Sequence, residues 1–128
     1  MQIEPIILNT LTDQFADRLN TVYAFGSFAA GNLTPESDVD VAFQAEEKLS
    51  DVALWKLQNQ LAAELSRDVD LIDLNHTTTV LQMQIVSKGR VLFCKDPSQL
   101  RQFEAQLAAM HLTLNEDRLE ILKSFVNG

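Results

Sequence analysis

Basic residues are scarce in this 128-residue chain: ten Lys and Arg stand against 18 Asp and Glu, which gives a net charge of -8. That sign is wrong for a surface that binds nucleic acid mainly by neutralising phosphates, so no direct nucleic-acid partner is expected. The one cysteine, Cys94, cannot form an internal disulfide. The sequence carries neither a secretory signal pattern nor an apolar run of membrane-spanning length, so we expect a cytoplasmic protein without a membrane partner.

Glycine and proline are also few, at four and three residues, and they stand singly where turns are expected. No linker, internal repeat or low-complexity tract divides the chain. Hydrophobic residues make up 46% and charged residues 22%, which is ordinary for a globular protein. The sequence therefore predicts one domain over residues 1–128.

The spacing of apolar residues predicts alternating helices and strands. Helical spacing occurs in four segments and β-type patterns in four others. We therefore expect an α/β or α+β fold in which a mixed four-stranded sheet is packed by helices, with a long C-terminal helix. The apolar stripe of that last helix fits either the core or a partner surface. The expected helices are 5–19, 50–66, 78–88 and the segment from 97 onward, and the expected strands are 21–25, 38–43, 69–74 and 91–93.

Two acids share one face of the second expected strand. Asp38 and Asp40 are two residues apart, so they project to the same side while Val39 and Val41 project to the other. Two carboxylates held this close would repel each other and raise one pKa unless a cation lies between them. Hard oxygen ligands on a rigid strand suit Mg²⁺, so the pattern predicts a metal site.

Small residues precede these acids. Gly26 has no side chain to obstruct a ligand, and Ser27 offers a hydroxyl and an amide at a turn where phosphate oxygens could bind. A third acid, Asp70, lies on the next strand, where it could complete a three-carboxylate metal site and accept a proton from an attacking hydroxyl. Together these residues indicate metal-assisted nucleotidyl transfer from a bound triphosphate such as ATP.

The same residues resemble a known signature. Gly26-Ser27, ten intervening residues and then Asp38-Val39-Asp40 are similar to the motif of the polymerase-β-like nucleotidyltransferase superfamily. The short length and the segment 67–74 resemble its minimal nucleotidyltransferase (MNT) branch, over roughly residues 5–95. The resemblance implies that Gly26 and Ser27 contact the nucleotide phosphates, that Asp38 and Asp40 bind Mg²⁺, and that Asp70 is the third catalytic and metal-binding carboxylate.

One position departs from the family pattern. Many members carry a basic residue where this chain has Ala30, so one expected phosphate contact is absent here. Nucleotide affinity or nucleotide choice is expected to differ as a result.

Overall, the chain most resembles MntA-type antitoxins, which are MNT proteins encoded with HEPN-domain ribonuclease toxins of the HepT type. The resemblance implies that AMP is transferred from ATP to a toxin tyrosine, with the toxin as protein partner. The acidic composition suits a basic, RNA-binding toxin. Two alternatives remain open: a small-molecule nucleotidyltransferase of the kind that modifies aminoglycosides, and a non-catalytic antitoxin that masks its toxin.

Several other polar and aromatic residues have ordinary structural interpretations. Asn75 and His76 after the third strand are expected to form a turn or a helix cap. Asp73 is expected to be a solvent-exposed or interfacial acid, because it lies on the face opposite Asp70. Trp55 is expected to pack, because it lies on the helix that carries the leucine stripe.

Overall fold

The computed structural model describes residues 2–110, and the predicted continuation of the terminal helix beyond residue 110 lies outside them. The choice between core and partner surface for its apolar stripe stays a prediction. The chain divides into two compact units, residues 1–96 and 97–128. In the second unit, residues 97–110 are helical and Leu107 is buried, as the apolar spacing indicated. The expectation of a single domain over residues 1–128 stays a prediction.

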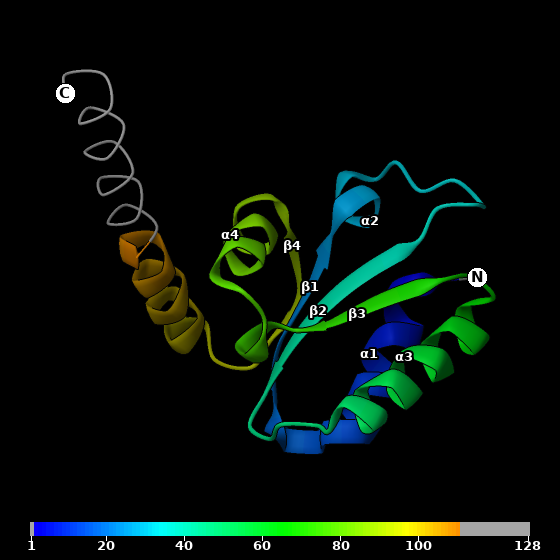
Figure 1. Ribbon diagram of the computed structural model, residues 1–128, viewed down its shortest axis with the longest axis horizontal. Coiled ribbons are helices and arrows are strands. Elements are labelled where there is room, and N and C mark those ends of the chain that lie inside the picture. Colours follow the sequence, from blue (N-terminus) through cyan, green and yellow to red (C-terminus); the bar gives the residue numbers. More distant parts are fainter. Residues whose placement is uncertain (1, 111–128) are drawn as a thin grey trace, which may run out of the picture. The chain divides into compact units, whose positions relative to one another are not determined.

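The first unit is built on the predicted mixed sheet (Figure 1). The strands lie in the order β3-β2-β1-β4. Strand β1 is antiparallel to both of its neighbours, whereas β2 and β3 run parallel. The four-stranded α/β fold expected from the sequence is thus confirmed. The strands are β1 (Leu19–Phe25), β2 (Val39–Ala45), β3 (Val69–Asp73) and β4 (Arg90–Cys94).

Helices cover both sides of this sheet. Figure 1 shows α1 (Ile3–Phe15) and α3 (Asp51–Leu65) together on one side and α4 (Thr79–Lys88) on the other. Three shorter helical turns link the elements. They are α2 (Gly26–Ala30) and the 3₁₀ turns η1 (Ala16–Arg18) and η2 (Leu74–His76).

The starts of α3 and α4 are fixed by side-chain caps. The Ser50 hydroxyl accepts a hydrogen bond from the Ala53 amide at 3.1 Å, and the Thr78 hydroxyl accepts one from the Leu81 amide at 3.2 Å. Each cap satisfies an amide that has no partner within its own helix. Among residues 2–110, no helix is long and apolar enough to cross a membrane.

The core lies between the sheet and the α1/α3 layer. Phe15 of α1 and Phe43 of β2 are fully buried, and their ring centroids are 5.0 Å apart. Alternate residues of β2 and β3 point into this layer, so the intervening residues must face the opposite side. Packing on the apolar face therefore fixes the strands that carry the acids. The apolar cluster includes Ile7, Leu11, Phe15, Val22, Ala24, Val39, Val41, Phe43, Leu57, Leu61, Leu65, Val69 and Leu71.

Two sequence expectations about the helical segments of this unit fail. The turn after β1 is a single turn of helix, α2, which was too short to leave a periodic apolar pattern. Trp55 does not pack: it is 61% exposed, because α3 turns its leucine stripe to the core and leaves this position on the outer face.

Candidate active site

Three strands align two acids and an aromatic residue in one row. Phe25 of β1 pairs with Asp40 of β2, and Asp40 pairs with Asp70 of β3. Residues paired in this way project from the same face, and here that face is opposite the α1/α3 core. Asp38 lies one residue before β2 rather than on the strand itself. The sheet therefore brings the three predicted acids, Asp38, Asp40 and Asp70, into one electrostatic cluster.

The carboxylates of Asp70 and Asp38 repel that of Asp40 within this cluster. Partial burial raises the pKa of Asp40 above its ordinary value, and the neighbouring carboxylates of Asp70 and then Asp38 raise it further. Within residues 2–110, no hydrogen bond or ion pair from a protein group stabilises these three side chains. A bound cation would remove the repulsion that the fold leaves in place.

Gly26 lies directly against the cluster. Its backbone has a φ of +60°, in the left-handed region that favours glycine. A Cβ atom at this position would lie 2.3 Å from Oδ2 of Asp40, so a larger residue would displace the carboxylate. Glycine at this position is expected to allow the approach of a ligand, and the structure adds a second reason for it, which is room for the Asp40 carboxylate.

Ser27 follows Gly26 as the second residue of α2 and is exposed. The Asn32 amide donates to the Ser27 carbonyl at 3.1 Å, which closes the end of this short turn. Because Ser27 is exposed, its hydroxyl lies at the surface next to Gly26. Its contact with phosphate stays a prediction.

The loop before Asp38 is held by a residue that sequence analysis did not single out. Arg67 donates from Nη1 to the carbonyl oxygens of Thr34 and Ser37, at 3.2 and 3.4 Å. The Ser37 hydroxyl also accepts from the Thr34 amide at 3.0 Å. Arg67 thus connects the entrance of β3 to the residue that precedes Asp38. Only the charge of Arg67 was visible in the sequence, because its partners are about 30 residues away.

A cavity of about 410 Å³ opens beside Gly26. Helix α4 contributes half of its lining, and no feature of the α4 sequence pointed to that role. Because its lining residue Gly26 also lies against Asp40, this cavity adjoins one acid of the row. Its lining residues are Phe25, Gly26, Ala30, Leu81, Gln84 and Lys88.

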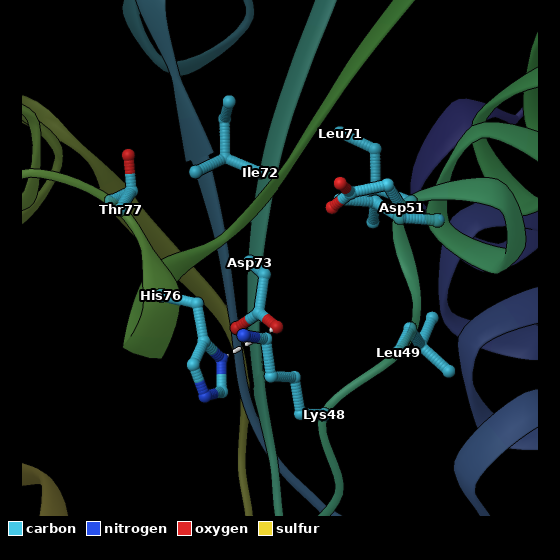
Figure 2. A pocket seen from close by; sticks show the side chains of 9 residues that line it. Lys48, Leu49, Asp51, Leu71, Ile72, Asp73, His76 and Thr77 are labelled. Carbon is cyan, nitrogen blue, oxygen red and sulfur yellow. Dashed lines mark hydrogen bonds and ion pairs between the residues drawn. The ribbon is translucent and has the colours of Figure 1, made fainter.

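A second, smaller cavity of about 220 Å³ lies at the other end of β3 (Figure 2). Figure 2 shows the Asp73 carboxylate turned toward the imidazole of His76, with Lys48 beside them. The His76 Nδ1 atom is 2.8 Å from Oδ2 of Asp73, and the Asn75 amide donates to Oδ1 at 3.2 Å. These contacts confirm the expected turn. The expectation of an exposed Asp73 is wrong, since the residue is only 8% exposed and caps η2.

Comparison with known proteins decides the family. The model of the polymerase beta nucleotidyltransferase family matches residues 7–98, which include Gly26, Ser27 and all three acids. The chain belongs to this nucleotidyltransferase family. It is also 34% identical, over 117 residues, to the protein adenylyltransferase MntA of Shewanella oneidensis, covering 91% of this chain and 82% of that protein.

Solved structures agree with this family assignment. A chain of a toxin–antitoxin complex solved with AMP-PNP is 32% identical and superposes with a TM-score of 0.84, covering 96% of this chain and 98% of that one. A second match comes from the tri-AMPylated HEPN toxin of Shewanella oneidensis in complex with its MNT antitoxin. The matched chain of that complex is 31% identical to this one and superposes with a TM-score of 0.79, covering 97% of this chain and 96% of the other. The resemblance to MNT antitoxins is thus confirmed for this nucleotidyltransferase.

Proposed function

We propose that this nucleotidyltransferase transfers AMP from ATP to a tyrosine hydroxyl of a HEPN-domain toxin and thereby neutralises the toxin. The observation that carries the proposal is the cross-strand pairing of Asp40 with Asp70, next to Asp38 and Gly26 and at the border of a cavity. The likeness to MntA and to the AMPylated toxin complex supports this acceptor.

The residues fit a magnesium ion. Within residues 2–110, no group of three or more His, Cys, Asp or Glu side chains is arranged so that it could hold a metal ion. Mg²⁺ at nucleotide sites commonly uses only one or two carboxylates and takes its other ligands from phosphates and water. Asp38 and Asp40 would supply those carboxylates. The pKa of Asp40 is raised first by its partial burial and then by repulsion from Asp70 and Asp38, and a cation would relieve that repulsion. When bound, Mg²⁺ would neutralise charge that develops on the triphosphate.

The chemistry is a displacement at the α-phosphorus of ATP. The tyrosine oxygen forms a bond to this phosphorus while the bond to the oxygen bridging the α- and β-phosphates breaks, and pyrophosphate leaves. The phenolic proton passes to the carboxylate of Asp70, which is exposed and can return it to water. Because the protein takes no covalent part, its contribution is to position the reactants and to stabilise charge.

Turnover distinguishes this proposal from masking. A HEPN toxin encoded beside this chain would be incubated with a tenth of its molar amount of the protein, together with ATP and Mg²⁺. Ribonuclease activity and toxin mass are then measured. We expect full loss of toxin activity, with a mass gain of one or more AMP units on a toxin tyrosine.

The Asp40→Asn variant is the control for this experiment. Masking would require stoichiometric protein, proceed without ATP and survive Asp40→Asn, because a binding surface does not need the acidic cluster. Full inhibition by this variant with no mass change on the toxin would contradict the proposal. Labelling of an aminoglycoside but not of the toxin would instead favour a small-molecule transferase.

A further inference from the structure

The cavity beside Gly26 has one basic residue in its lining, and it comes from α4 rather than from the phosphate-binding segment. We propose that Lys88 is a substrate-binding residue whose ammonium group holds the triphosphate of ATP. The inference rests on the proposed function, because it needs a nucleoside triphosphate in this cavity. It assigns to α4 the phosphate contact that Ala30 cannot make.

The end of α4 is held close to Gly26. Gly89, which follows the helix, lies so near β1 that a Cβ atom there would be 2.9 Å from the Ala24 carbonyl oxygen. Ala24 lies near the end of β1, two residues before Gly26, and Ile85 of α4 is buried. Close backbone packing thus fixes Lys88 at the Gly26 end of the cavity.

The lining residues of α4 share one helical face. Leu81, Gln84 and Lys88 are spaced by three and four residues, which places their side chains on one side of the helix. All three line the cavity, together with Ala30. Ala30 is small and uncharged, so it leaves room in the cavity for a side chain from α4. Lys88 can therefore supply the positive charge that Ala30 lacks.

The expected ligand is strongly anionic. A nucleoside triphosphate in this cavity would bring several negative charges close to Asp40, whose carboxylate adjoins the lining residue Gly26, and a basic side chain would offset part of that charge. Lys88 is exposed, and within the described residues its side chain makes no hydrogen bond or ion pair. Its three ammonium donors therefore remain available for phosphate oxygens.

Other nearby cations are already engaged. Arg90 forms an ion pair with Glu4 at 2.7 Å and lies over the ring of Phe28. Arg67 donates to the carbonyl groups of the loop before Asp38. Neither lines the cavity.

The test measures binding rather than turnover. Calorimetry would give the Kd of α,β-methylene-ATP, which cannot donate AMP, for the full chain with Mg²⁺. Ligand-observed NMR would give the Kd of adenosine. We expect Lys88→Gln to weaken binding of the ATP analogue about tenfold and to leave adenosine binding unchanged, because a charge-assisted contact to phosphate is lost. Lys88→Arg keeps the charge and should stay within about threefold of the parent protein.

Lys56→Gln is the matched control, because Lys56 is an exposed helical lysine on α3 and does not line this cavity. It should bind the analogue as the parent protein does. Unchanged analogue binding by Lys88→Gln, or an equal loss of adenosine binding, would overturn the assignment of Lys88. If the parent protein binds the analogue through Lys88 but never labels the toxin, the proposed acceptor fails while the role of Lys88 stands.

Discussion

The two ends of strand β3 carry acids in opposite situations. At one end, Asp73 is buried, and its two oxygens accept hydrogen bonds from the Asn75 amide and from His76. At the other end, Asp70 lies beside Asp40, whose pKa is raised by burial and by like charge. A satisfied carboxylate stabilises a turn, whereas clustered carboxylates without protein partners cost stability and are suited to a cation.

The loss of stability caused by the clustered carboxylates around Asp40 depends on pH. A carboxyl group whose pKa is higher in the folded than in the unfolded state binds protons more tightly when folded. Folding is therefore unaffected by this group below its unfolded pKa and becomes less favourable as pH rises through the folded value. At neutral pH, ionised Asp40 destabilises the fold. Removing the charge of an acid is therefore expected to lower stability at the Asp73 end of β3 and to preserve or raise it at the end where Asp70 lies beside Asp40.

The largest expected effect is on catalysis at the Asp40 end. Asp40→Asn should reduce AMP transfer at least about a thousandfold, since the loss of the proposed metal ligand would remove several kcal/mol of charge stabilisation. The Tm at pH 7 should stay equal or rise, because the variant removes repulsion from Asp70 and Asp38. Transfer is measured with labelled ATP and unfolding by circular dichroism. Normal transfer by this variant would refute the assignment of the site.

The next effect tests the contact between Gly26 and Asp40. Gly26→Ala should lower AMP transfer about a hundredfold, because its Cβ atom would lie 2.3 Å from Oδ2 of Asp40 and must displace that carboxylate. Gly31→Ala is the matched control: this glycine also has a positive φ, of +75°, but its Cβ atom would have no neighbour within 4 Å. Both variants should lose about 1–2 kcal/mol of stability from backbone strain. Equal transfer rates for the two would show that the contact with Asp40 does not matter.

A third effect is on stability alone, at the opposite end of β3. Asp73→Ala should destabilise the fold by about 1–3 kcal/mol, because it removes the buried carboxylate that accepts from the part-buried Asn75 amide and contacts His76. The kcat for AMP transfer should stay within about twofold of the parent value at temperatures where the variant is folded. Chemical denaturation and transfer assays measure the two quantities. A large loss of kcat in the folded variant would mean that the two ends of β3 are coupled.

Much of this structure could be predicted from local sequence patterns. Alternation of acid and valine at residues 38–41 predicted both the strand and the side to which Asp40 points, because the valines must enter the apolar core and the intervening residue then faces the other way. Ser50 predicted the start of α3, since a hydroxyl that accepts from a helix amide is a local feature. The acids of the candidate site followed from the same alternation.

Features that depend on distant parts of the chain were not predictable. The burial of Asp73 arises from η2 folding back over its carboxylate. The period-two pattern of the strand is compatible with either a buried or an exposed side chain at this position. Likewise, Lys88 belongs to the Gly26 cavity only because Gly89 packs on Ala24, 65 residues earlier. No local spacing encodes such a contact. The exposure of Trp55 likewise depended on which face of α3 met the sheet.

The smallest expected effect concerns Arg67, which holds the loop before Asp38 through the carbonyl groups of Thr34 and Ser37. Arg67→Met should reduce kcat about threefold to tenfold and raise the Mg²⁺ concentration needed for half-maximal rate, because a charged donor to the loop is lost and Asp38 is less well placed. Arg67→Lys should recover part of both quantities, since it retains one charged donor group. A simple loss of stability would lower the Tm without changing the Mg²⁺ requirement. A variant that keeps the parent Mg²⁺ dependence at lower Tm would therefore show that Arg67 supports the loop and does not position the metal ligand.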